Sequence, residues 1–198
     1  MSRFVRIARP IAMASGLLAV ASIITEFSAG GSPEAMASTT GIIAAALALG
    51  AVLSLLFGLV ALHAVQGDQL SGLGSFGFVV ALVGAVMTAG GVWSSVFVVP
   101  GLAEAAPSVL ETGIPSVVGG FILSYSLLGL GGLLYGIATL RAGVISKGLA
   151  IFLIVGGVIC LAPLPARYFL LAIAISLVAR RLNTTVTAIG QRPTAHVT

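Results

Sequence analysis

Residues 41–62 read GIIAAALALGAVLSLLFGLVAL, a stretch with no charged residue and no proline. A helix needs about 20 apolar residues to span the roughly 30 Å hydrocarbon core of a bilayer. The stretch therefore predicts a transmembrane helix, which we place at residues 41–64.

The composition of the whole chain matches that of the quoted stretch. Hydrophobic residues make up 59% of the 198 residues, charged residues only 7%, and the mean hydropathy is +1.21. Soluble domains carry about 25% charged residues, and a chain of this size cannot hide so much apolar surface from water. Lipid must therefore be the solvent for much of it, which predicts an all-α polytopic membrane helix bundle. The length suits one domain, residues 1–182.

Apolar runs elsewhere predict five more spans. The first lies between Arg9 and Glu26 and resembles a signal peptide, with arginines before it and small residues after it; we interpret it as a first span. Residues 183–198 are polar and Thr-rich, which predicts a disordered cytoplasmic tail. The expected transmembrane helices are residues 10–27, 41–64, 75–99, 116–140, 145–162 and 165–182.

The apolar stretch 145–182 leaves two alternatives, because Pro163, Pro165 and Arg167 interrupt it. It forms either two short spans, each of about 18 residues and about 27 Å, or one span with a re-entrant segment. With six spans, every Lys and Arg except Arg167 lies on the cytoplasmic side; with five, the arginines after residue 179 move outside. Cytoplasmic loops carry an excess of basic residues. This rule favours six spans with both termini in the cytoplasm.

The richness in Arg, Ala and Gly is typical of a high-GC bacterial genome, so we expect a multi-pass protein of the bacterial cytoplasmic (inner) membrane. Its two outer loops are longer than turns. In the first, Ser32-Pro33-Glu34 predicts a helix start, with a capping Ser and with Pro at the first position. In the second, residues 100–116, apolar and polar residues occupy different faces, which predicts a short interfacial helix. Pro107 would break that helix unless a helix begins there, and an irregular loop is the alternative.

Two helix ends resemble each other. LFGLVALHA at residues 56–64 and LYGIATLRA at 134–142 share Leu, Gly, Leu and Ala at matching positions. Either a helical hairpin was duplicated, or the match arose by chance in a chain built from few residue types. Together with Trp93, Val99-Pro100 and the Ala-rich loop that follows, these segments resemble uncharacterised six-helix integral membrane proteins of bacteria. The resemblance covers roughly residues 40–182 and implies six helices, but no activity, cofactor or functional residue.

Groups that carry chemistry are scarce in the predicted spans. Intramembrane ionisable residues mark ion paths and substrate sites, and Asp, Glu, Lys, Arg and His are absent from the middle of each span. His63 and His196 cannot pair across a haem inside the bundle, and the lone Cys160 excludes an internal disulfide and a cysteine metal cluster. We therefore predict no enzyme activity, cofactor, metal site or nucleic-acid binding. The expected partners are the lipid bilayer and other membrane-protein subunits.

Small residues recur at helical spacing on three predicted spans. Close approach of helix backbones holds membrane helices together where the hydrophobic effect cannot. We interpret these stripes as packing surfaces, although a chain rich in Gly and Ala also produces such spacings by chance. Their members are Gly50, Ser54, Gly58, Gly84, Thr88, Gly91, Ser95, Gly129, Gly132 and Gly136.

One polar constellation lies near the outer ends of the third and fourth predicted spans. At about 1.5 Å per residue its two groups have similar depth, so hydroxyls and aromatic rings meet at one level of the outer leaflet. They line a small pocket for a lipid headgroup or neutral solute, or they serve only interhelical hydrogen bonding and an aromatic belt. The residues are Trp93, Ser94, Ser95, Ser124, Tyr125 and Ser126.

Two functions are compatible with these features. The first is a non-catalytic membrane subunit or scaffold, which the absence of charge at depth and of soluble domains favours. The second is a carrier or sensor for a lipid or small neutral solute bound in the outer-leaflet pocket. The sequence by itself favours the first.

Overall fold

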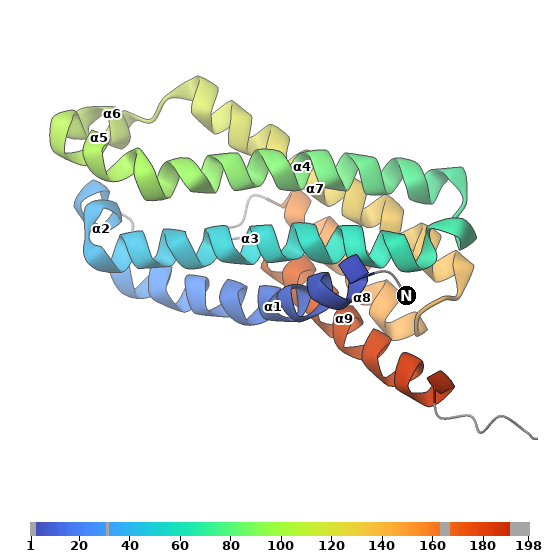
Figure 1. Ribbon diagram of the computed structural model, residues 1–198. Coiled ribbons are helices and arrows are strands. Elements are labelled where there is room, and N and C mark those ends of the chain that lie inside the picture. Colours follow the sequence, from blue (N-terminus) through green and yellow to red (C-terminus); the bar gives the residue numbers. More distant parts are fainter. Residues whose placement is uncertain (1–2, 31, 163–166, 191–198) are drawn as a thin grey trace, which may run out of the picture.

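The structure is a computed structural model that describes residues 3–30, 32–162 and 167–190 (Figure 1). This part of the chain is built mainly of helices. No strand occurs among these residues, so the all-α prediction is confirmed. The elements are α1 (Arg3–Ala29), α2 (Pro33–Ala37), α3 (Thr39–Gln66), η1 (Gly67–Gln69), α4 (Gly72–Phe97), α5 (Val99–Ala105), α6 (Pro107–Thr112), α7 (Pro115–Ala142), α8 (Lys147–Leu161) and α9 (Phe169–Gly190).

The long helices run side by side and alternate in direction (Figure 1). Helices α1, α4 and α8 run toward one end of the bundle, and α3, α7 and α9 run back. We name the end that carries α2, α5 and α6 the loop end. The opposite end is named the basic end, because the helix segments in that half carry Arg6, Arg9, Arg141, Lys147, Arg180 and Arg181.

Four helices are long and apolar enough to cross a membrane, as judged over the described residues: Phe4–Ala29, Thr39–Gln69, Gly72–Phe97 and Pro115–Ala142. Helix α8 has 15 residues and rises only about 22 Å, less than the roughly 30 Å hydrocarbon core. Six spans are therefore not confirmed. The expected span 145–162 is shortened to the 15 residues of α8, which ends at Leu161. The expected span 165–182 is shifted along the chain, because α9 begins only at Phe169.

Helix α9 differs from the sequence expectation at its other end as well. It continues to Gly190, past residue 182 where the disordered tail was expected to begin. No glycine or proline interrupts the chain between Phe169 and Ile189, so nothing local stops the helix before that glycine. The rest of the expected tail, residues 191–198, lies outside the described residues.

The short helices of the loop end form as their local sequence predicts. Ser32 is the N-cap of α2, where its hydroxyl accepts a hydrogen bond of 3.2 Å from the Ala35 amide. A hydrogen bond from Ser32 also lowers the pKa of Glu34. Helix α6 begins at Pro107, so that proline starts a helix rather than breaking one, and the alternative of an irregular loop is wrong. The interfacial position of these helices stays a prediction.

Helix α4 packs along α7, and glycines allow their backbones to approach closely. A Cβ atom added to Gly84 would collide with the backbone of Leu128, and one added to Gly131 would collide with the backbone of Ala81. Thr88, one turn after Gly84, is fully buried and donates a 2.8 Å hydrogen bond to the Gly84 carbonyl. This interface therefore depends on residues without a bulky side chain.

The other residues of the predicted stripes also lie between helices. Gly58 of α3 faces Ala12 of α1 and Ile175 of α9. A Cβ atom at Gly136 would meet Ile154 of α8, and one at Gly91 would meet the ring of Phe121. The remaining stripe residues are Gly50, half-buried near Leu18, the buried Ser54, the half-buried Ser95, Gly129 beside Gly157 and Cys160, and Gly132 beside Leu171.

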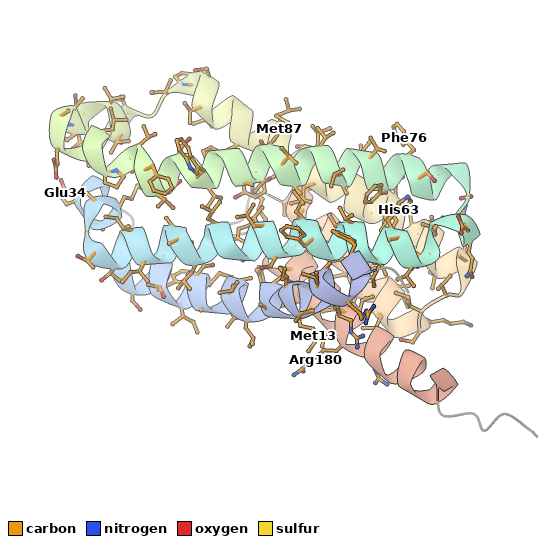
Figure 2. All side chains as sticks on the ribbon, in the orientation of Figure 1. Met13, Glu34, His63, Phe76, Met87 and Arg180 are labelled. Atoms are coloured by element: carbon orange, nitrogen blue, oxygen red, sulfur yellow. The ribbon has the colours of Figure 1, made fainter. Side chains whose placement is uncertain are left out.

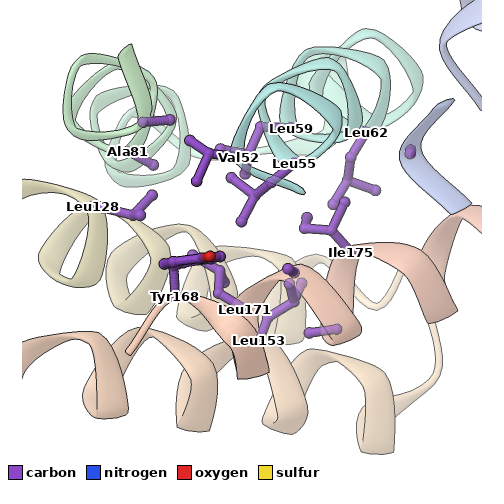
Figure 3. Close-up of a cluster of buried hydrophobic side chains, with 14 of the residues drawn as sticks. Val52, Leu55, Leu59, Leu62, Ala81, Leu128, Leu153, Tyr168, Leu171 and Ile175 are labelled. Atoms are coloured by element: carbon purple, nitrogen blue, oxygen red, sulfur yellow. The ribbon is translucent and has the colours of Figure 1, made fainter. Parts of the chain in front are cut away.

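The interior is a continuous cluster of buried aliphatic side chains (Figure 3). Val52, Leu55 and Leu59 of α3 belong to it together with Leu128 of α7, and α9 contributes Leu171 and Ile175. Large apolar side chains also cover the outside. Phe76, which projects from α4 in Figure 2, is 60% exposed. Apolar surface on both the inner and outer faces of a helix bundle fits a lipid environment.

Candidate functional site

A cavity of about 680 Å³ lies at the loop end, and we call it the loop-end cavity. Its walls come mainly from the ends of the long helices, with Met36 of α2, Val99 of α5, and Tyr168 and Phe169 at the junction with α9. Pockets of about 300–1,000 Å³ suit small-molecule ligands. The lining residues are Ile23, Glu26, Phe27, Ala29, Gly30, Met36, Gly41, Ala44, Ala45, Ala48, Val92, Ser95, Val99, Phe121, Tyr125, Tyr168 and Phe169.

The start of α9 lies on the inner side of the cavity, where Tyr168 and Phe169 line it. We call α8 and α9 together the α8–α9 hairpin. Helix α7 has 28 residues, about 42 Å at 1.5 Å per residue, whereas α8 is about 22 Å long. The start of α9 lies at the level of Tyr125, whose ring stacks on that of Tyr168 at a centroid distance of 6.5 Å. Tyr125 lies about ten residues, or about 15 Å, from the start of α7 at Pro115. The longer helices continue beyond this level and enclose the space above it.

Tyr168 closes the inner side of the cavity and is held in place from two directions. Its ring is 3% exposed and parallel to that of Tyr125, with an interplanar angle of 5°. Its hydroxyl lies 3.3 Å from the Ser22 hydroxyl of α1, within hydrogen-bonding distance. These contacts join the α8–α9 hairpin to both α1 and α7, so the cavity has a fixed aromatic floor.

A cation lies next to this floor. The Arg167 guanidinium carbon is 4.9 Å from the centroid of the Tyr125 ring, which is a cation–π contact. The Arg167 carbonyl accepts a 3.3 Å hydrogen bond from the Cys160 thiol. The Phe121 ring lies on α7 one turn before Tyr125, with centroids 6.3 Å apart. Aromatic rings therefore surround the deep side of the cavity.

The mouth of the cavity is marked by its exposed lining residues. Phe27 and Met36 are exposed, as is Glu26, whereas Ala44 and Val92 on the inner walls are buried. Among the described lining residues, Glu26 is the only one with a formal charge. The cavity is thus apolar inside with a single carboxylate at its mouth.

Two of the six residues that the sequence predicted as a pocket line this cavity, namely Ser95 and Tyr125. Trp93 does not, since it is 51% exposed and its ring contacts that of Phe97 at 5.2 Å. Successive helix residues are about 100° apart, so the neighbours of a lining residue point elsewhere. The other three hydroxyls lie outside the lining: Ser94 donates to the Gly90 carbonyl, Ser124 donates to the Gly120 carbonyl, and Ser126 is half-buried.

Sequence reasoning missed three of the residues that define the cavity. The sequence marks Glu26 only as the end of the first apolar run, and no pattern singles out Phe121. Tyr168 lies directly after the interrupted stretch at Arg167, where no pattern predicts a partner. The available signals in the sequence were Glu26, an acid at the end of an apolar run, and Tyr168, an aromatic residue beside another. Only the fold shows that both face one cavity.

A second polar cluster lies at the basic end, between α3, α4 and α7. The Gln66 side-chain amide is fully buried and donates hydrogen bonds to the Tyr135 hydroxyl at 2.8 Å and to the Thr139 hydroxyl at 3.0 Å. His63 stacks on Phe78 with ring centroids 3.9 Å apart. His63 Nδ1 and Gln66 Oε1 are buried without a hydrogen-bond partner in the structure. Gln66 and Thr139 are not among the residues predicted from the sequence. The available signal is helical spacing, because Gln66 follows His63 by three residues and Thr139 follows Tyr135 by four.

No cluster of metal-ligating side chains occurs among the described residues, where groups of three or more His, Cys, Asp or Glu are absent. Comparison with known proteins adds no identification: no protein-family model matches the chain, and neither a curated protein nor a solved structure does. The resemblance to six-helix bacterial membrane proteins therefore rests on the quoted helix ends alone.

Proposed function

We propose that the chain is an integral protein of the bacterial cytoplasmic membrane, with six membrane segments and both termini in the cytoplasm. Four segments are the long helices, and the other two are α8 and α9, which enter from the basic end and return to it. The described basic residues other than Arg167 lie in that half, which supports a cytoplasmic location for it. A hairpin that turns within the membrane keeps this charge distribution without requiring two full spans.

Within this topology, we propose that the protein is a non-catalytic carrier or sensor that binds a lipid or lipid-like amphiphile in the loop-end cavity. The single observation that supports this function is a cavity of about 680 Å³ with a mostly apolar lining. It lies in the half that we assign to the outer leaflet, where lipid is the most concentrated apolar solute. An apolar lining favours a hydrocarbon chain over a polar solute, because transfer of apolar surface into it is favourable.

The cavity favours this function over a scaffold. A scaffold needs outer surfaces that bind neighbouring proteins. The close-packed glycines lie in the interior of the bundle and do not supply such a surface. A scaffold does not require a cavity. Larger side chains in that space would add packing contacts without impairing a scaffold. The lining residues also give no reason to invoke catalysis, because Ser95 donates its hydroxyl to the Gly91 carbonyl rather than to a base.

A matched pair of substitutions on α3 tests the binding function. Ala45 lines the cavity, whereas its neighbour Ala46 is exposed on the outer surface. Ala45→Phe should fill part of the cavity and weaken binding of a fluorescent single-chain amphiphile to the purified protein by about tenfold. Ala46→Phe adds the same ring outside and should leave binding unchanged.

Three outcomes would contradict the proposal. Wild-type protein that binds no amphiphile would refute it, as would equal effects of the two substitutions. Gentle extraction that yields a stoichiometric protein partner and no bound lipid would support the subunit or scaffold alternative. Thermal unfolding of both variants in detergent controls for a loss of fold.

A further inference from the structure

The charge of the loop-end cavity bears on the kind of amphiphile that it takes, an inference that rests on the proposed function. Glu26 is the one formally charged residue among the described lining residues. It lies three residues before Ala29, the last residue of α1, so about 4.5 Å from the loop end of that helix. Its side chain is exposed at the mouth of the cavity, so the carboxyl group is accessible to a ligand there.

The walls impose a direction on a bound amphiphile. The deep side consists of the rings of Phe121, Tyr125 and Tyr168, and aliphatic residues of α3 and α4 form the sides. A hydrocarbon chain therefore occupies the interior, and the polar head remains at the mouth beside Glu26. The head that complements this position is one that carries hydrogen-bond donors and a positive charge.

We propose that the loop-end cavity selects amphiphiles whose head carries an ammonium group, which pairs with the Glu26 carboxylate. Charge-assisted hydrogen bonds from an ammonium to a carboxylate are roughly twice as strong as neutral ones. A head with only a phosphate meets the same carboxylate as a like charge and is disfavoured. The ammonium group comes either from a simple amine amphiphile or from a zwitterionic lipid of the phosphoethanolamine type.

Arg167 determines where the ammonium group lies. Its guanidinium already occupies a position over the Tyr125 ring, at 4.9 Å from the centroid. A second cation at that ring would be repelled, so the aromatic floor does not serve as a cation cage. The ammonium group is therefore held at the mouth by Glu26, and the hydrocarbon chain contacts the aromatic rings.

Competition binding with four amphiphiles of identical acyl chain tests this selection. Their heads are a primary ammonium, a phosphoethanolamine, a phosphate and a neutral diol. In neutral detergent at low salt, wild-type protein should bind the two ammonium-bearing amphiphiles at least tenfold more tightly than the phosphate. Glu26→Gln should reduce this ratio to about twofold, chiefly through weaker binding of the two ammonium-bearing amphiphiles.

Two further variants separate the role of the charge from that of the fold. Glu34 is an exposed acid at the same end of the bundle but does not line the cavity, so Glu34→Gln should keep the tenfold preference. Glu26→Asp retains the charge and should keep most of it. Loss of preference in Glu34→Gln would mean that general surface charge, rather than Glu26, selects the ligand, and would overturn the proposal.

The outcomes distinguish this inference from the proposed function. If all four amphiphiles bind equally well to wild-type protein, the cavity binds lipid without selecting its head, and only the ammonium inference fails. Tighter binding of the phosphate, or of the phosphoethanolamine without the primary ammonium, also overturns the inference. If none of the four binds, the proposed function itself fails.

Discussion

Replacing Gly84 by alanine should separate α4 from α7. The added Cβ atom would lie 2.6 Å from the Leu128 Cα atom and would also meet the Leu128 backbone nitrogen. The first distance is about 0.8 Å shorter than the 3.4 Å at which ordinary contact begins. A backbone cannot rotate away as a side chain can, so the two helices must move apart along their interface.

The size of the effect follows from two opposing terms. Overpacking of a well-packed interior costs about 1–3 kcal/mol. Alanine in place of glycine in a helix interior is favourable by roughly 0.5–1 kcal/mol, because glycine loses more backbone freedom on folding. We expect Gly84→Ala to lower the free energy of unfolding by about 1–2 kcal/mol.

The same helix supplies the control. Beyond the backbone of its own helix and its chain neighbours, Gly90 has no atom within 4 Å of an added Cβ atom. Gly90→Ala should therefore only gain helix propensity and be neutral or slightly stabilising. Titration of the purified protein with a denaturing detergent, followed by circular dichroism, measures both variants. Equal stability of Gly84→Ala and Gly90→Ala would refute the close α4–α7 packing.

Two other changes test the topology and the basic-end cluster. On a Cys160→Ala background, an impermeant thiol reagent should label Ser108→Cys in intact cells but not Ser146→Cys, since both residues are exposed and they lie at opposite ends of the bundle; labelling of the second would contradict a cytoplasmic basic end. Gln66→Leu should destabilise the fold by about 1–3 kcal/mol, because it removes the hydrogen bonds to two buried hydroxyls. Tyr135→Phe removes only one of these hydroxyls and should cost less, and the reverse order in detergent unfolding would argue against the cluster.

Local sequence predicted the long helices well. The expected spans 41–64 and 116–140 correspond to α3 and α7, which extend only a few residues further at each end. Ser32 before a proline predicted the start of α2, and Pro107 predicted a possible start of α6. These features depend on neighbouring residues and on an apolar length, both of which are read along the chain.

The candidate site was predictable only in part. Tyr125 and Ser95 were expected to share a pocket from their similar depth, and both line the cavity. Trp93 was included because it is near Ser95 in sequence, although the helix turns it toward the outside. Glu26 and Tyr168 come from distant segments, so nothing local linked either of them to α7.

The sequence by itself determined that the chain is helical and rich in apolar runs of membrane-spanning length. It predicted six spans, whereas the described structure contains four helices that are long and apolar enough to cross a membrane. Only the tertiary structure decided which face of each helix is interior and how far the α8–α9 hairpin extends. The physical reason is the solvent: in lipid the outer face of a helix is as apolar as the inner one, so hydrophobic periodicity no longer marks the buried side. The depth of the Tyr168 turn, and with it the cavity, depends on contacts with Tyr125 and Ser22 that the fold alone brings together.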